Sequence, residues 1–432
     1  MKLLIKGGRV IDPANKRDER LDVLIDRGKV AQLGKNLASD GAEVISAESY
    51  WVVPGLVDMH VHFRQPGRED RETLLTGSRA AAKGGFTSVV PMANTDPVAD
   101  HRGAVEFILA EAKRVALVNI FPVGSVTKGL GGQILSDIGD LAGAGCVALS
   151  DDGKPIRNTT LMRHALEYAG MFGLPIIAHE EDPYLFEGGV MHEGYVSTVL
   201  GLRGIPGISE SIMVARDIEL LGYVKGKIHF AHISTARSVE LIREAKRKGL
   251  PVTCESAPHY VAFTDEDVAG YDTRFKVNPP LRSRHDREAV RKGLAEGVID
   301  CIATDHAPHV ENEKDAEFDA APFGMIGLET SLGVCLTQLV HTKLLSPAQL
   351  VERMSTTPAR ILGLEKGTLS VGADADVTLI GPEDKWVVRE EEFESRSKNS
   401  PFIGQELVGR AKMTIVGGLI VMRDGKIVER RK

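Results

Sequence analysis

The sequence predicts an α/β fold, a (β/α)8 TIM-like barrel, with a small β-sandwich domain formed from both ends of the 432-residue chain. Between about 52 and 363, short apolar segments alternate with amphipathic ones, as expected of parallel strands connected by helices. Eight such units over roughly 300 residues fit a closed barrel better than a doubly wound sheet. No GxGxxG or GxxxxGK[ST] motif follows a predicted strand, which argues against a nucleotide-binding open sheet.

Both ends of the chain predict short strands connected by tight turns. Strands at 3–5 and 10–11 flank Gly7-Gly8, and a hairpin over 22–33 turns at Asp26-Arg27-Gly28-Lys29. Near the other end, 375–380 and 414–428 show the same strand-turn-strand pattern. Neither end can bury a core alone. We therefore assign residues 1–52 and 364–432 to one β-sandwich domain and residues 53–363 to the barrel.

The predicted barrel strands are short, apolar and followed by polar residues. They cover 52–60, 86–90, 118–123, 146–149, 175–178, 227–231, 251–254 and 300–303. Amphipathic periodicity predicts helices between most of them, over 72–82, 102–114, 160–172, 210–221, 236–248 and 286–296.

The composition, with 43% hydrophobic and 26% charged residues, is typical of a soluble enzyme. A net charge of −7 argues against a surface that binds nucleic acid. No stretch approaches the ~18 consecutive apolar residues of a membrane span, and the first residues lack a signal-peptide core, so we expect a cytoplasmic protein without a membrane partner. The absence of a CxxC motif predicts buried free thiols at Cys146, Cys254, Cys301 and Cys335.

The first predicted barrel strand ends in two histidines, His60 and His62. Residues i and i+2 of a strand point to the same face, so both imidazoles can hold one metal ion. A His-x-His pair alone is weak evidence, because histidine is often a satisfied core or surface residue. The remaining ligands must come from other strand ends.

Further histidines and carboxylates follow other predicted strands, at the rim where such barrels carry their active sites. A charge run on the surface would be scattered along the sequence instead. Four histidines and two aspartates suit one or two divalent ions, with zinc the first choice. The Asp151-Asp152 pair supplies a candidate bridging anion. The residues concerned are His60, His62, His179, His232, Asp305 and one of the pair Asp151 and Asp152.

Seven motifs, in order along essentially the whole chain, resemble those of the bacterial dihydroorotases of class I, within the amidohydrolase superfamily. The resemblance implies reversible, zinc-dependent cyclisation of N-carbamoyl-L-aspartate to (S)-dihydroorotate plus water, in de novo pyrimidine biosynthesis. The motifs are His60-Val61-His62-Phe63-Arg64, Asn94-Thr95, Asp151-Asp152-Gly153, Ala178-His179-Glu180, His232-Ile233-Ser234-Thr235, Val277-Asn278-Pro279-Pro280-Leu281-Arg282 and Ala303-Thr304-Asp305-His306-Ala307-Pro308-His309.

The resemblance also implies two zinc ions and a role for each ligand. His60, His62 and Asp305 would hold the more buried ion. His179 and His232 would hold the second, with Asp152 as the bridge. Asp151 is the next candidate for the bridge. Lys154 is a further alternative, because many amidohydrolases use a carboxylated lysine, although it lies in a turn.

The substrate contacts implied by the resemblance surround these ligands. Arg64 and Asn94 would bind the carboxylate, as a planar guanidinium beside an amide suits that group. Asn278 would contact the ring amide. A metal-activated hydroxide would attack the ring carbonyl, with Asp305 as base and then acid. The full expected set is His62, Arg64, Asn94, Asn278, His309, Phe323 and Gly324. Ala93 departs from the proline that the family often has before Asn-Thr.

Two other functions compete with this interpretation. A hydantoinase or allantoinase would be expected to carry a lysine bridge and to need no arginine for a carboxylate. A catalytically inactive subunit that scaffolds aspartate transcarbamoylase would be expected to lose metal ligands. The family implies a homodimer, while a complex with aspartate transcarbamoylase remains open. Structural roles are the default for His192, His229, His259 and His306.

Overall fold

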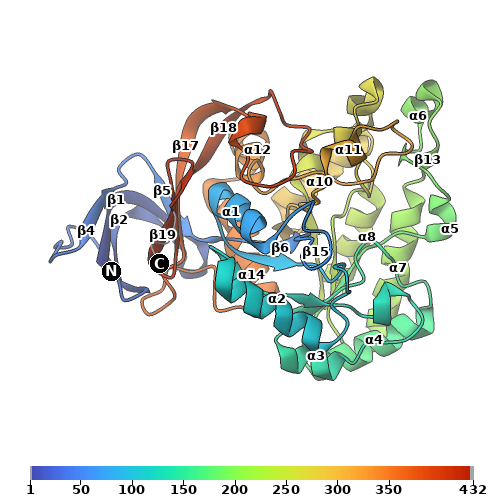
Figure 1. The fold of residues 1–432 in the computed structure, drawn as a ribbon, viewed down its shortest axis with the longest axis horizontal. Helices are drawn as coiled ribbons and strands as arrows, with labels where there is room; N and C mark the ends of the chain where they lie inside the picture. Colours follow the sequence, from blue (N-terminus) through green and yellow to red (C-terminus); the bar gives the residue numbers. More distant parts are fainter. Residues whose placement is uncertain (1, 429–432) are drawn as a thin grey trace.

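The computed structural model describes residues 2–428 and has two parts, a (β/α)8 barrel and a sheet formed from both ends of the chain (Figure 1). The predicted terminal segments also include residue 1 and residues 429–432, which lie outside the described residues. Within 2–428, no helix combines the length and apolar character needed to cross a membrane. All four cysteines are buried and free, as predicted.

The barrel consists of parallel strands in two hydrogen-bonded groups, which confirms the predicted fold. Phe121-Pro122 interrupts the third strand position, and a backbone bridge between Val61 and His306 joins the first strand to the segment after the last. The first group is β6 (Leu56–Val61), β7 (Phe86–Pro91) and β8 (Asn119–Ile120). The second is β9 (Val123–Gly124), β10 (Ala148–Leu149), β11 (Ile176–Ala178), β14 (Ile228–Phe230), β15 (Val252–Ser256) and β16 (Cys301–Ile302).

Helices surround the barrel, and all six predicted helices are present with ends shifted by a few residues. Capping fixes these ends: Ser283 caps the tenth helix by accepting from the Asp286 amide, and Gly297 ends it with φ 78°. The long helices are α1 (Leu74–Gly84), α2 (Arg102–Val115), α4 (Thr159–Met171), α7 (Ile208–Tyr223), α8 (Ala236–Arg247) and α10 (Arg284–Glu296).

Shorter elements lie in the connections and were not predicted, because a single helical turn carries too little periodicity to be recognised. The helices are α3 (Ile138–Ala144), α5 (Pro183–Phe186), α6 (Tyr195–Leu200), α9 (Pro258–Ala262), α11 (Glu311–Lys314), α12 (Ser331–Cys335), α13 (Pro347–Val351) and α14 (Thr357–Ile361). Two short strands, β12 (Met191–His192) and β13 (Gly204–Ile205), pair with each other.

The terminal sheet combines strands from both ends of the chain, left of the barrel in Figure 1, and the two sets meet where β17 pairs with β5. Its hydrogen-bonded order is β20-β19-β18-β17-β5-β1-β2-β3, with β4 paired to β1. Its strands are β1 (Lys2–Asp12), β2 (Arg17–Asp26), β3 (Lys29–Gly34), β4 (Glu43–Ser46), β5 (Trp51–Pro54), β17 (Val377–Val387), β18 (Glu406–Val416), β19 (Leu419–Arg423) and β20 (Lys426–Ile427).

Two strand predictions need correction. The break expected at Gly7-Gly8 is a register shift inside one long strand, β1. The single strand expected over 52–60 is two strands: β5 pairs with β1 and β17 in the terminal sheet, and β6 enters the barrel. Gly55 lies between the two strands. A Cβ at this position would lie 2.0 Å from the Thr87 hydroxyl oxygen, so only glycine fits here.

An apolar cluster to which nearly every barrel strand contributes fills the barrel, as in other folds of this type. Its buried members include Met59, Val90, Val123, Ala148, Ile177, Ala231 and Ala303. The histidines and carboxylates predicted to bind metal lie at or just beyond the carboxyl ends of the same strands.

Candidate metal centre and active site

The two histidines of the first barrel strand converge on two aspartates from distant parts of the chain. His60 lies within β6 and His62 directly after it, and both are buried. Nε2 of His60 lies 3.4 Å from Asp152 Oδ1 and 3.5 Å from Asp305 Oδ1. Nε2 of His62 lies 3.1 Å from Asp305 Oδ1 and 3.4 Å from Asp152 Oδ2. The predicted pair therefore shares one site with both carboxylates.

Histidines from two further strands complete the group around Asp152. His179 follows β11 and His232 follows β14. Nδ1 of His179 and Nε2 of His232 each lie 3.5 Å from Asp152 Oδ1, and 2.9 Å from one another. The Asp152 carboxylate thus contacts all four histidines, the position that a ligand shared by two ions would occupy.

Several ligand atoms in this group are buried with no hydrogen-bond partner among the described residues: His60 Nε2, His179 Nε2 and Asp152 Oδ1. Buried polar atoms are almost always satisfied, so orphaned ones need an explanation such as a bound ion. Imidazole nitrogens and carboxylates at this spacing fit divalent zinc. Two triplets have ligand atoms within 4.8 Å of one another, His60–His62–Asp305 and His60–Asp152–His232.

Burial and charge act against each other at these groups. Burial alone would lower the pKa of His60, but Asp152 and Glu255 raise it well above its ordinary value. Burial alone would raise the pKa of Asp152, but His60 and the contact with His179 hold it well below. The carboxylate is therefore ionised at neutral pH and attracts positive charge.

Two candidate ligands have left-handed backbone conformations, which are rare outside glycine. The φ angle is 34° at His232 and 49° at Asp305. Such residues cost about 1–3 kcal/mol each and concentrate at functional sites. Next to Asp305, the Thr304 amide and hydroxyl both donate to buried Asp58, which holds this strained turn against the first strand.

Glu255 holds a residue of the candidate metal centre, although sequence reasoning missed it. Its carboxylate accepts from His60 Nδ1 at 2.7 Å and from His229 Nε2 at 3.2 Å. The other ring nitrogen of His229 pairs with Thr253 Oγ1 at 2.9 Å. His229, Glu255 and Cys301 also lie within ligand distance of one another, but both nitrogens of His229 are already bonded, so the group is a hydrogen-bond network. The missed signal was a charged residue directly after the predicted seventh strand.

A cavity of about 270 Å³ opens beside the histidines and aspartates. Asn94 Oδ1 pairs with His62 Nδ1 at 2.9 Å, which leaves Nε2 of that ring for a metal. The Asn278 amide donates to Glu181 at 3.2 Å. All seven expected substrate contacts line this cavity: His62, Arg64, Asn94, Asn278, His309, Phe323 and Gly324. Arg71, Gly153 and Ala307 line it too and were not predicted.

One end of the cavity is strongly basic. Arg64 is half-buried there, and its desolvation together with Arg71 lowers its pKa to about 10, so it remains charged at neutral pH. Burial and the two arginines lower the pKa of His309 to about 3, so its ring is neutral. Arg71 donates to Glu313 at 2.5 Å. It was missed because it lies in a charged run, which usually marks a solvated surface.

The alternative bridging ligands face elsewhere. Asp151 Oδ1 accepts from the amides of Val126 and Thr127 at 2.8 and 3.0 Å, and its Oδ2 accepts from the Thr127 hydroxyl. Lys154 is exposed and does not line the substrate cavity. Of the three candidates, Asp152 is the one that contacts the histidines.

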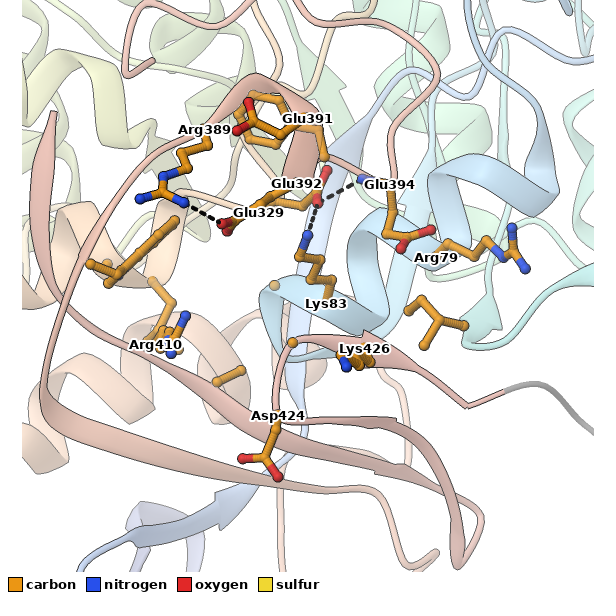
Figure 2. A pocket seen from close by; sticks show the side chains of 18 residues that line it. Arg79, Lys83, Glu329, Arg389, Glu391, Glu392, Glu394, Arg410, Asp424 and Lys426 are labelled. Atoms are coloured by element: carbon orange, nitrogen blue, oxygen red, sulfur yellow. Dashed lines mark hydrogen bonds and ion pairs between the residues drawn. The ribbon is translucent and has the colours of Figure 1, made fainter. Parts of the chain in front are cut away.

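A larger cavity of about 650 Å³ lies between α1, α12 and the last strands, and none of the predicted site residues lines it. Figure 2 shows that its wall carries side chains of both charges. Within it, Glu329 lies 3.5 Å from Lys83 and accepts from the Glu394 amide at 2.9 Å. Because helices of the barrel and strands of the terminal sheet both line it, this cavity lies at the junction between the two parts of the molecule.

Comparisons with known proteins show that this chain is similar to dihydroorotases. A family model described as "Dihydro-orotase-like" matches residues 50–238. A dihydroorotase from Pelotomaculum thermopropionicum is 56% identical over 98% of this chain and 99% of its own length. One from Geotalea daltonii is 53% identical over the full length of both.

Solved structures of related enzymes share the fold. An L-hydantoinase (dihydropyrimidinase) from Arthrobacter aurescens superposes with a TM-score of 0.89 at 27% identity, covering 99% of this chain and 97% of that one. A dihydropyrimidinase from Brevibacillus agri gives a TM-score of 0.86 at 24% identity, covering 99% of this chain and 96% of that one, which shows the fold alone.

Proposed function

This chain belongs to the dihydroorotase family, and from that premise we infer that it is a cyclic amide hydrolase of pyrimidine biosynthesis. It interconverts N-carbamoyl-L-aspartate and (S)-dihydroorotate plus water. The observation that carries this proposal is the Asp152 carboxylate in contact with four histidines, beside a cavity lined by a half-buried arginine, Arg64.

We propose that the centre holds two zinc ions, with Asp152 shared between them. His60, His62 and Asp305 would hold one ion, and His179 and His232 the other. The unpartnered ligand atoms described above support this assignment. When bound, the ions would lower the pKa of a water molecule and polarise the ring carbonyl.

Asp305 is proposed as the proton carrier. Burial alone would raise the pKa of its carboxyl, but the rings of His62 and His60 hold it well below its ordinary value. An ionised carboxylate at the cavity wall can take a proton from the attacking water and then deliver it to the ring nitrogen that leaves. The two transfers occur in sequence, so one group can serve for both.

The cavity wall accounts for selectivity in this proposal. Arg64 and Asn94 would bind the substrate carboxylate, and Asn278 the ring amide. The neutral ring of His309 can donate or accept a hydrogen bond beside the carboxylate. Backbone groups of Phe323 and Gly324 would close the site. The half-buried Arg64 guanidinium is partly removed from water, which is costly unless an anion pairs with it, and this favours dihydroorotate over the uncharged ring of hydantoin.

The proposal extends to partners and location. The enzyme acts on a small molecule, and we expect a cytoplasmic homodimer without nucleic-acid or membrane partners. Light scattering of the purified protein, alone and mixed with aspartate transcarbamoylase, tests the dimer and decides whether a complex forms.

The decisive experiment measures turnover of dihydroorotate, carbamoyl-aspartate, hydantoin and allantoin alongside metal content. We expect the first two to react, with two zinc ions per chain. Arg64→Met should lose dihydroorotate turnover and retain zinc. Faster turnover of hydantoin or allantoin than of dihydroorotate would overturn the assignment, and so would zinc-replete protein that turns over neither pyrimidine precursor.

A further inference from the structure

The connection between β17 and β18 leaves the terminal sheet and reaches the rim of the barrel. Its residues 394–399, here called the rim segment, begin beside the cavity in Figure 2, where the amides of Glu394 and Ser395 donate to Glu329 at 2.9 and 3.2 Å. From there the segment continues to Glu72 and then to residues that line the substrate cavity. The part of the chain that forms the terminal sheet therefore also contacts residues of the active-site wall.

The middle of the rim segment is attached to the first barrel loop through buried Glu72. Its carboxylate accepts from the Ser395 hydroxyl and, at 3.1 Å, from the Arg396 amide. The same carboxylate pairs with His306 Nε2 at 3.2 Å. His306 follows Asp305 in sequence, so the rim segment is linked to the turn that carries a candidate metal ligand.

Asn399, at the end of the rim segment, joins both walls of the substrate cavity. Its side-chain amide donates to the carbonyls of Ala307 at 3.0 Å and Gly324 at 3.1 Å. Its side-chain oxygen accepts from the His309 amide at 3.2 Å, and its main-chain carbonyl accepts from the Ile326 amide at 3.1 Å. Asn399 is 5% exposed, so water cannot easily replace these bonds.

The two walls that Asn399 joins are in close contact. Gly324 has φ 129°, and a Cβ there would lie 2.9 Å from the Ala307 Cβ and 3.0 Å from His309 Nε2. A small increase in the separation of these backbones would move His309 away from Gly324. Because both residues line the cavity, that movement changes the shape of the substrate site and leaves the metal ligands in place.

We propose that Asn399 is a positioning residue for substrate binding: its amide sets the spacing between the His309 wall and the Phe323–Gly324 wall. The inference rests on the proposed function for its kinetic consequence. The hydrogen bonds themselves can be tested in the protein without substrate.

The test compares Asn399→Ala and Asn399→Asp with Asn119→Ala in the full-length, zinc-loaded enzyme. Asn119 is a matched control because its amide donates to Thr87 and Asp376, at the opposite ends of the strands. Asn399→Ala should raise the KM for dihydroorotate roughly tenfold, the effect expected when buried hydrogen bonds are lost. Its kcat should fall much less, and its zinc content should equal that of the wild type.

Amide hydrogen exchange supplies the second readout. In Asn399→Ala the His309 amide should exchange faster than in the wild type. In Asn399→Asp it should stay protected, because the carboxylate still accepts its hydrogen bond, while KM rises through loss of the two donors. Equal KM values for Asn399→Ala and Asn119→Ala, or unchanged exchange at His309 in Asn399→Ala, would overturn the proposal. A wild-type enzyme inactive on dihydroorotate would refute the proposed function, and the exchange comparison would then decide the inference.

Discussion

Glu255 accepts a hydrogen bond of 2.7 Å from Nδ1 of His60, and this bond directs the opposite ring nitrogen toward Asp152 and Asp305. Burial alone would raise the pKa of Glu255, but His60 and His229 lower it to about 2, so the acceptor is ionised. A ligating imidazole usually needs such a partner to fix its tautomer and orientation.

Replacing Glu255 should therefore weaken the metal centre without removing a ligand. Glu255→Gln is expected to lower zinc affinity by about 10–100-fold, because an amide cannot hold the His60 ring as a carboxylate does. Competition with a chelator measures this change. Glu210→Gln is the control, since Glu210 is equally buried but bonds to Ser234 and Thr235. Equal zinc affinities for the two variants would contradict the role given to Glu255.

The two neighbouring aspartates should behave differently. Asp152→Asn is expected to reduce bound zinc by about half or more, since the shared anionic ligand is lost. Asp151→Asn should retain the full zinc content and lose stability, because Asp151 holds the amides of Val126 and Thr127. Metal analysis of both proteins after gel filtration separates the two roles. Full zinc content in Asp152→Asn would move the bridge to Asp151 or Lys154.

Asp305 should be required for chemistry more than for folding. Asp305→Asn is expected to lower kcat by about 10²–10⁴-fold, the range for removal of a general acid–base group, and to retain the fold and most of the zinc. Asp300→Asn is a matched control at the other end of the same strand, where Asp300 pairs with Lys246. Near-normal turnover in Asp305→Asn would exclude Asp305 as the proton carrier.

Glu329 should make stability depend on pH in the acid range. Burial raises the pKa of this carboxyl to about 7 from an ordinary value of 4.5, against the opposing effect of Lys83. Between these values the folded protein holds a proton that the unfolded chain has released. The free energy of unfolding therefore decreases as pH rises through this window, by at most about 1.4 kcal/mol per pH unit.

Glu329→Gln should remove this dependence, because the amide does not titrate and still accepts from the Glu394 backbone. Between pH 4.5 and 7, the free energy of unfolding of the variant should increase relative to that of the wild type by on the order of 3 kcal/mol. Urea unfolding at several pH values measures it. Glu391→Gln, at an exposed position in the same cavity wall, should follow the wild-type curve. If the Glu329→Gln curve also runs parallel to the wild type, the pKa of Glu329 is not raised.

Local patterns were sufficient to predict the barrel, because each strand and each long helix carries its own periodicity. These local patterns failed where pairing with a distant strand decides the structure. The run from Trp51 to Val57 is apolar on both sides of Pro54-Gly55, yet β5 pairs with β1 and β17 while β6 pairs with β7. Nothing in the run itself specifies which sheet each half joins.

The candidate ligands were predictable for a related reason: each stands at or just after the end of a predicted strand, and the strand ends meet at one rim. The supporting residues were not. Glu255 lies one residue beyond the predicted end of the seventh strand, in a position where its contact with His60 cannot be inferred. Asn399 is 90 residues from His309, its partner. Such long-range bonds depend on the assembled fold and leave no local pattern.

The order in which the chain emerges from the ribosome gives the terminal sheet a further consequence. β5 is complete early in synthesis, but its neighbour β17 follows more than 300 residues later, and Asn399 later still. Domains generally fold as units during translation. Here the inserted barrel can form first, while its substrate cavity stays unfinished until the β17–β18 connection arrives. Nascent chains shorter than that connection would therefore be packed barrels in which the His309 wall and the Phe323–Gly324 wall are not yet held at the spacing that favours substrate binding.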